Sequence, residues 1–280
     1  MRYFEQLPRP PLVPFVECLW TAWDPRLRRD RVRERIVPDG CPELIFHLAD
    51  RFSRRVGGRW VRQPRAFLAG TLTRPWTLRP GPAVRCFGVR FRPGAMRRFL
   101  PVDPRAARDR ETPLAEMLGE TATRSLLRDL VAARGAPRRL ALLEVWLCGR
   151  LGEDPAPSPA AAAVDRIRAS GGRLRIEDLA AALGTTRRRL ERLFLAELGI
   201  PPKQFARLMR FQAALAAVGR GGRDSLVELA LEHGYFDQSH LLAEARALAG
   251  RKVQADRRLD GQLARHFTDP ARIRALLAAP

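Results

Sequence analysis

One helical pattern occurs twice in the carboxy-terminal part of the sequence. Matching residues lie 50 positions apart up to a glycine and 51 positions apart after it. Each copy predicts a helix of about eight residues, a turn suited to the left-handed backbone of glycine, and a longer helix with one apolar face. This is the plan of a helix-turn-helix unit. The matching positions are Leu179-Ala180 with Leu229-Ala230, Gly184 with Gly234, Leu190 with Leu241, and Gly199 with Gly250.

Capping residues and a long connecting segment support this interpretation. Ser225 and Glu228 form a capping box, Asp237 is placed to cap the next helix, and Thr186 is its equivalent in the first copy. A generic pair of helices can produce the spacing of one copy. Two copies joined by the amphipathic segment 201–218 instead predict second helices held about one DNA turn, ~34 Å, apart.

The whole chain divides near residue 155, where a segment rich in proline and small residues predicts a linker. The expected organisation is an amino-terminal domain (1–151), a linker (152–160), a double helix-turn-helix domain (161–258) and a tail (259–280). Helices are predicted after the linker at 160–169, 176–183, 186–197, 201–218, 225–233 and 237–249, with a short one near 270–277.

The upstream part predicts an α+β domain. Short β-like runs alternate with turn signals and suggest a small antiparallel sheet or barrel. After Arg92-Pro93-Gly94, apolar residues at spacings of three and four predict helices packed beside the strands. The expected strands are 32–37, 43–48, 67–70, 76–78 and 84–91, and the expected helices are 95–100, 114–118, 125–134 and 138–151.

The net charge of +21 suggests a polyanionic partner, because basic side chains on phosphates release counterions. Charge alone does not locate the binding site, since the upstream part is the more basic one. Nearly all the positive residues are arginines, which suit multidentate phosphate contact.

Several other classes of protein find little support. The four cysteines contain no CxxC pair and the histidines no HxxxH spacing, so no metal site is expected, and no cofactor site is expected either. No apolar run is long enough to cross a membrane, and the start lacks the layout of a secretion signal, so we expect a cytoplasmic protein without membrane contact.

One β-hairpin of the upstream domain crowds Asp39, Cys41, Glu43 and His47 together. Such a cluster suggests a thiol nucleophile or a ligand pocket. The simpler interpretation is a turn at Asp39-Gly40 and a buried, small Cys41. We therefore expect no catalytic residues.

Several runs of residues in both parts of the chain carry a family resemblance. In the carboxy-terminal part they are Gly184-Thr-Thr-Arg-Arg-Arg-Leu190-Glu-Arg192-Leu-Phe194, Gly199-Ile-Pro-Pro-Lys-Gln-Phe205, Arg207-Leu-Met-Arg210 and Gly234-Tyr-Phe-Asp-Gln-Ser-His-Leu241. In the upstream domain they are Val37-Pro-Asp-Gly-Cys-Pro-Glu-Leu-Ile-Phe46 and Gly88-Val-Arg-Phe-Arg-Pro-Gly94. The first set, over about a hundred residues, resembles the AraC/XylS-type regulators, and the second resembles the amino-terminal domain of one subgroup of that family.

The resemblance implies roles for the first unit. Arg188, Glu191 and Arg192 fall where base edges are contacted, with arginine suited to guanine and glutamate to cytosine. DNA backbone contacts are expected from Thr186, Arg187 and Arg189.

The second unit departs from the family pattern. Ala243 stands where a basic residue usually contacts bases, Glu244 follows it, and Ala245 replaces a core phenylalanine. We expect this unit to hold the DNA backbone with little base discrimination and to have a looser core. The expected backbone contacts are Gln238, Ser239 and His240.

These observations predict a sequence-specific transcription regulator that is not an enzyme. Its expected partners are double-stranded DNA, a small-molecule effector at the amino-terminal domain, a second copy of the chain, and RNA polymerase. One alternative is a sequence-blind nucleoid protein. The other is an enzyme that uses Cys41 or Cys86 and is targeted to DNA.

Overall fold

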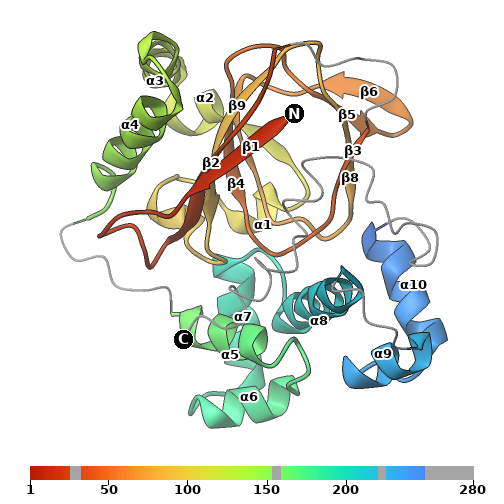
Figure 1. The fold of residues 1–280 in the computed structure, drawn as a ribbon. Helices are drawn as coiled ribbons and strands as arrows, with labels where there is room; N and C mark the ends of the chain where they lie inside the picture. The colour runs from red at the N-terminus through yellow and green to blue at the C-terminus, as the bar shows by residue number, and fades with distance from the viewer. Residues whose placement is uncertain (26–32, 153–158, 220–224, 250–280) are drawn as a thin grey trace.

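The computed structural model describes residues 1–25, 33–152, 159–219 and 225–249. Figure 1 shows a β-rich amino-terminal domain, with strands coloured from red to yellow, above a group of helices coloured from green to blue. We call the helices after residue 159 the helical domain. The predicted tail, with its helix near 270–277, and most of the predicted linker lie outside the described residues.

A six-stranded sheet forms the centre of the amino-terminal domain. Neighbouring strands in it are all antiparallel. In strand β4 (Glu43–His47), Leu44 lies opposite Val89 of one neighbouring strand and opposite Leu68 of the other, so three fully buried side chains form one row. The spatial order is β1 (Arg2–Gln6), β2 (Val16–Asp24), β9 (Val84–Phe91), β4 (Glu43–His47), β7 (Ala66–Ala69) and β10 (Glu111–Pro113).

A smaller antiparallel sheet faces the first one. Its order is β3 (Glu34–Ile36), β8 (Trp76–Arg79), β5 (Ser53–Val56) and β6 (Arg59–Arg62). The last two strands are joined through Gly57 and Gly58, whose φ angles of 53° and 83° match the turn that favours hairpin twist.

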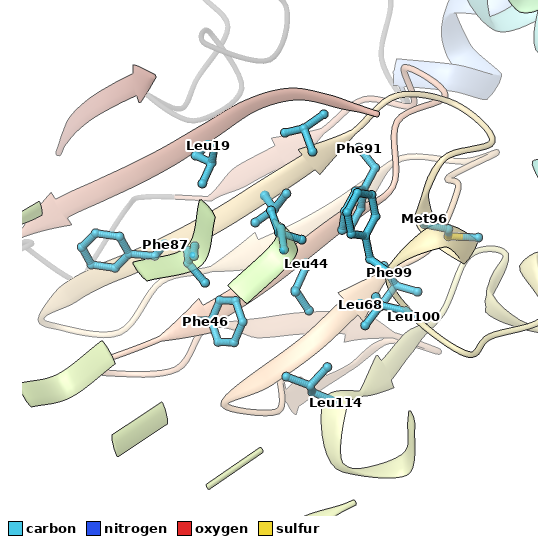
Figure 2. Packing of buried hydrophobic residues seen from close by; sticks show 14 of the residues in the cluster. Leu19, Leu44, Phe46, Leu68, Phe87, Phe91, Met96, Phe99, Leu100 and Leu114 are labelled. Carbon is cyan, nitrogen blue, oxygen red and sulfur yellow. The ribbon is translucent and has the colours of Figure 1, made fainter. Parts of the chain in front are cut away.

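Strand alternation divides the core into two layers. In β9, Phe87, Val89 and Phe91 face a core of leucines and phenylalanines, whereas Cys86 and Arg90 face the second sheet. Figure 2 shows the first layer, in which the Phe91 ring lies beside the Phe99 ring. Helices α2 (Leu114–Leu118), α3 (Glu120–Ala132) and α4 (Ala136–Cys148) cover this layer and contribute buried leucines, each worth about 1.5–3 kcal/mol.

The predicted α+β class is confirmed, but several elements were missed. Residues 95–100 form only a 3-10 turn, Met96–Arg98, because the chain turns down to bury Met96 and Phe99 in the core. The predicted helix 125–134 begins at Glu120. Strands β1, β2, β5, β6 and β10 and the short helix α1 (Pro104–Ala107) were not predicted.

Two physical reasons account for the missed strands. β2 is buried over most of its length and therefore lacks the alternation of a half-buried strand. β5 and β6 are rich in arginine, so their apolar signal is weak, although the pair Gly57-Gly58 is a recognised hairpin signal.

The helical domain follows the predicted order. The long connecting helix runs between the two helix pairs, as Figure 1 shows. Its helices are α5 (Ala161–Ala169), α6 (Ile176–Ala182), α7 (Arg187–Glu197), α8 (Pro202–Gly219), α9 (Leu226–Glu232) and α10 (Gln238–Ala249).

The two copies of the repeat have the same turn. The N–H of Thr185 donates to the carbonyl of Ala180 at 3.0 Å, and that of Tyr235 donates to Ala230 at 2.8 Å. The turn glycines Gly184 and Gly234 have φ angles of 61° and 72°, a region that residues with a Cβ rarely adopt. The predicted pair of helix-turn-helix units is therefore present, α6 with α7 and α9 with α10.

A buried ion pair joins the two domains. The guanidinium of Arg168 on α5 lies 2.6 Å from the carboxylate of Glu17 on β2, and both side chains are almost fully buried. Its second nitrogen also lies 3.5 Å from the sulfur of Cys41. Because both charged groups are buried, the attraction between them is needed to offset the free-energy cost of their desolvation.

A turn of the amino-terminal domain, residues 38–41, packs against α8. The carbonyl of Pro38 accepts a hydrogen bond of 2.6 Å from the buried Gln212 side chain. Gly40 has a φ of 82°, and a Cβ there would lie 2.6 Å from the ring of Phe205. Only glycine fits this close approach.

Both helix-turn-helix units also contact the amino-terminal domain. The hydroxyl of Thr71 donates to the carbonyl of Leu198, just after α7, at 2.9 Å. The guanidinium of Arg35 on β3 donates to the carbonyl of Ala249, at the end of α10, at 2.7 Å. The amino-terminal domain thus holds the ends of both second helices.

Candidate nucleic-acid interface

Helix α7 begins at a side-chain cap. The hydroxyl of Thr186 accepts a hydrogen bond of 3.2 Å from the N–H of Arg189. On the inner face Leu190 and Phe194 are buried, and Leu193 is half-buried. This packing fixes the rotation of α7 about its axis and leaves the opposite face to solvent.

The outer face of α7 carries the base-contacting residues that the resemblance implies. Arg188 and Arg192 are exposed and lie one helical turn apart. Neither forms an ion pair within the described residues. Arg189, at the start of the helix, is exposed as well.

Glu191 lies at the edge of this face and is engaged. Its carboxylate is 2.9 Å from the Nε of Arg187, and a second nitrogen of Arg187 is 2.6 Å from Glu177 on α6. Arg187 is thus shared between two carboxylates, although its side chain remains more than half exposed. Arg187, a predicted contact to the DNA backbone, therefore forms an ion pair with Glu191, a predicted contact to a base.

The second unit begins with the predicted Asp237 cap. The N–H of His240 donates to the Asp237 carboxylate at 2.7 Å, and the N–H of Phe236 donates to the Nδ1 of His240 at 3.4 Å. The His240 ring also meets the edge of the buried Tyr235 ring. Gln238, Ser239 and His240, the three predicted backbone contacts, are all exposed.

The three residues of α10 that depart from the family pattern differ in their burial. Ala243 is exposed, whereas Ala245 is fully buried in the core. Glu244 points inward, and its carboxylate lies 2.7 Å from Arg207 and 3.3 Å from Arg210, both on α8. Glu244 therefore connects α10 to α8 and does not lie on the exposed face of α10.

One exposed basic residue on α10 was not predicted. Arg246 lies one turn after Ala243 on the same face. The sequence contains a signal for it, since Arg246 is the only arginine between Gln238 and Ala249. The family motif, however, places the base-contacting residue at Ala243.

The hairpin cluster of the amino-terminal domain is an ion-pair network. Asp39 forms an ion pair with the buried Arg90, and Glu43 lies 2.9 Å from the same guanidinium. Cys41 is buried, and Gly40 forms the predicted turn. The predicted turn at Asp39-Gly40 and the predicted burial of Cys41 are confirmed.

A small cavity lies behind this network between the two sheets. Its volume is about 60 Å³, and its walls include Trp20, His47, Trp76 and Arg90. Burial raises the pKa of the Cys86 thiol, which also lines the cavity. A neutral thiol is a poor nucleophile.

Two kinds of feature are absent from the described residues. No group of histidine, cysteine and acidic side chains there is arranged to hold a metal ion. No described helix combines the length and the apolar character needed to cross a membrane.

Two protein families match separate parts of the chain. Residues 5–113 match a "Domain of unknown function (DUF6597)", and residues 179–258 match a "Helix-turn-helix domain". No curated protein sequence matches the chain significantly.

Solved structures of ToxT from Vibrio cholerae are similar in fold. One at 1.65 Å resolution is 11% identical, with a TM-score of 0.45 over 93% of this chain and 99% of that chain. Another, of ToxT bound to an unsaturated fatty acid, is 11% identical, with a TM-score of 0.44 over 84% of this chain and 92% of that one.

The helix-turn-helix match begins within α6, continues through α10 and includes the residues that carry the AraC/XylS resemblance. The repeated units, their caps and the exposed basic face of α7 agree with it. The chain is a DNA-binding transcription regulator that carries an AraC-type double helix-turn-helix domain behind a β-rich amino-terminal domain.

Proposed function

We propose that the first helix-turn-helix unit reads base edges in the major groove through Arg188, Glu191 and Arg192. The observation that carries this proposal is the outer face of α7, where two exposed arginines form no ion pair within the described residues. A free guanidinium can bind O6 and N7 of guanine with two hydrogen bonds. The buried Leu190 and Phe194 hold α7 at a fixed rotation beneath them.

Backbone contacts would set the register of both units. In the first unit Thr186, Arg187 and Arg189 lie at the start of α7, where phosphates flank the major groove. In the second unit the exposed residues Gln238, Ser239 and His240 occupy the equivalent turn. Ala243 offers no hydrogen bond to a base, so the two adjacent half-turns of the DNA site are read unequally.

The pair Arg187 and Glu191 exchanges partners in this mechanism. In the free protein the Glu191 carboxylate binds Arg187. On DNA, Glu191 would accept a hydrogen bond from a cytosine amino group, while Arg187 would turn to a phosphate. Exposed ion pairs contribute little to stability, so the exchange costs little.

Substitution of two arginines tests these roles. We expect Arg192→Gln to cost about 1–3 kcal/mol on the preferred site and to relax the preference at one base position. Arg187→Gln should weaken binding to all sequences alike. The measurement is binding of the full chain to a duplex selected from random sequence, to its single-base variants and to a random duplex. An equal loss on selected and random DNA for both variants would defeat the assignment.

The same measurements give the ratio of affinities for selected and random DNA, which distinguishes a specific regulator from a sequence-blind nucleoid protein. A specific regulator binds its site about 10³-fold or more tightly than random DNA. A ratio below about ten would favour the nucleoid alternative. The feature that favours this alternative is the second unit, where Ala243 replaces the usual base-contacting residue.

We propose no enzymatic activity for the chain. Cys41 and Cys86 are both buried, Cys41 beside Arg168 at the domain contact and Cys86 in the wall of the small cavity between the sheets. Alkylation of the native protein should change neither DNA binding nor any turnover of added substrates. A turnover that alkylation abolishes would favour the thiol enzyme instead.

An effector would act through the cavity between the sheets. Small-molecule sites usually measure about 300–1,000 Å³, so binding in a cavity of about 60 Å³ requires its walls to move. Asp39 and Cys41 form one wall, and the same turn contacts α8 through Pro38 and Gly40. An effector that displaced this turn would change the contact with the helical domain. Self-association and contact with RNA polymerase remain predictions from the family resemblance.

A further inference from the structure

A groove of about 600 Å³ separates the first helix-turn-helix unit from α8. We call it the interunit groove. Six basic and two acidic side chains line it, beside apolar and small residues. The basic ones are Arg173, Arg175, Arg187, Lys203, Arg207 and Arg210, and the acidic ones are Glu177 and Glu191.

The second unit borders the same groove. The guanidinium of Arg173, just before α6, donates to the carbonyl of Glu232 at the end of α9, at 3.3 Å. Arg207 and Arg210 meet Glu244 of α10 across the other side. The groove therefore lies where the two units approach each other, with α8 beneath it.

Four of the six cations already have partners. Arg187 binds Glu177 and Glu191, Arg207 and Arg210 bind Glu244, and Arg173 binds two backbone carbonyls. Arg175 and Lys203 are exposed and form no ion pair within the described residues. These two side chains come from different elements, the residue before α6 and the first turn of α8.

We infer that the interunit groove binds backbone phosphates of the DNA segment between the two major-groove contacts, with Arg175 and Lys203 as the phosphate ligands. This inference rests on the proposed function. Two units that enter successive major-groove faces leave the intervening backbone opposite the helix that joins them. Arg175 and Lys203 form no ion pair within the described residues and are available for this contact, in which each neutralised phosphate releases condensed counterions.

The test compares two double variants of the full chain with the same loss of charge. Arg175→Gln with Lys203→Gln changes the groove. Arg124→Gln with Arg138→Gln, at exposed positions of α3 and α4, is the control. Affinity for a selected duplex and for a random duplex is measured at several salt concentrations. Far-ultraviolet circular dichroism and thermal unfolding verify that both proteins are folded.

We expect the groove variant to lower the slope of log affinity against log salt by about 1.8, since each phosphate contact contributes about 0.9. The loss should be the same on both duplexes, so the specificity ratio stays constant. Hydroxyl-radical footprinting should show lost protection between the two half-sites. The control variant should keep the wild-type slope and footprint.

Three results would overturn the inference. One is an unchanged slope in the groove variant. Another is a loss confined to the selected duplex, which would indicate base contact. The third is stoichiometric binding of inorganic tripolyphosphate that the groove variant abolishes while its DNA slope is unchanged, which would assign the groove to a small polyphosphate. The Arg192→Gln comparison tests the proposed function separately, because it changes specificity and not the salt slope.

Discussion

His47 lies on the inner face of β4 and is almost fully buried. Its Nδ1 is 3.1 Å from the sulfur of Cys86, and its Nε2 is 3.2 Å from the side-chain oxygen of Gln63. Burial lowers its pKa from 6.5 to about 4, although the hydrogen bond that its Nε2 donates to the Gln63 side-chain oxygen opposes the shift. The imidazole is therefore neutral in the folded protein at neutral pH.

This shift predicts acid destabilisation of the amino-terminal domain. Between about pH 6.5 and about pH 4 the unfolded imidazole binds a proton that the folded one does not, so the free energy of unfolding falls with falling pH. The full effect is about 3 kcal/mol. Urea unfolding of the wild type and of His47→Gln at several pH values measures it. The variant should have the flatter profile, and parallel profiles would contradict the assignment.

At the level of elements, Glu244 holds α10 against α8. Its carboxylate is buried, and the two arginines that it contacts are partly exposed. Arg210 also stacks 4.8 Å from the centre of the Tyr235 ring in the turn before α10. One carboxylate thus links the connecting helix, the turn and the second helix of the second unit.

We expect Glu244→Ala to destabilise the helical domain by about 1–3 kcal/mol, because the hydrogen bonds to charged groups are lost while the arginines regain water. DNA affinity should fall with it, since the second unit is held less firmly. Glu232→Ala, at an exposed position on α9, is the matched control and should have little effect on either quantity. Equal unfolding midpoints for the two variants would show that Glu244 does not hold α10 against α8.

At the scale of the whole molecule, the domains share a buried contact surface. Val37 of the amino-terminal domain belongs to the core of the helical domain, and Arg168 of α5 is paired with Glu17 of β2. The contact extends to the ends of α7 and α10 through Thr71 and Arg35. Buried and polar contacts therefore connect the two domains directly.

Removal of one partner tests this coupling. Arg168→Met leaves the Glu17 carboxylate buried and unpaired, which should cost about 3–5 kcal/mol and separate the unfolding of the two domains in calorimetry. Glu17→Gln with Arg168→Met should recover most of the loss, because no charge stays buried. A single variant as stable as the wild type would show that the ion pair does not join the domains.

Local signals predicted much of the helical domain. The caps Thr186, Ser225 and Asp237 and the turn glycines have the predicted roles. Base and backbone roles for α7 and α10 remain predictions, although the residues concerned are exposed. The strand β2 was missed because distant strands bury it over most of its length, and the hairpin β5–β6 because its arginines weaken the apolar signal.

The pair of helix-turn-helix units and the division into an α+β and an all-α part are encoded locally, because helix period, caps and turns depend on near neighbours. Which arginines form ion pairs depends on the folded arrangement. Arg168, Arg187 and Arg210 look alike in the sequence but have buried or neighbouring carboxylates as partners, whereas Arg188 and Arg192 have none within the described residues. A charged side chain selects its partner in space, and that choice depends on residues far away in the chain.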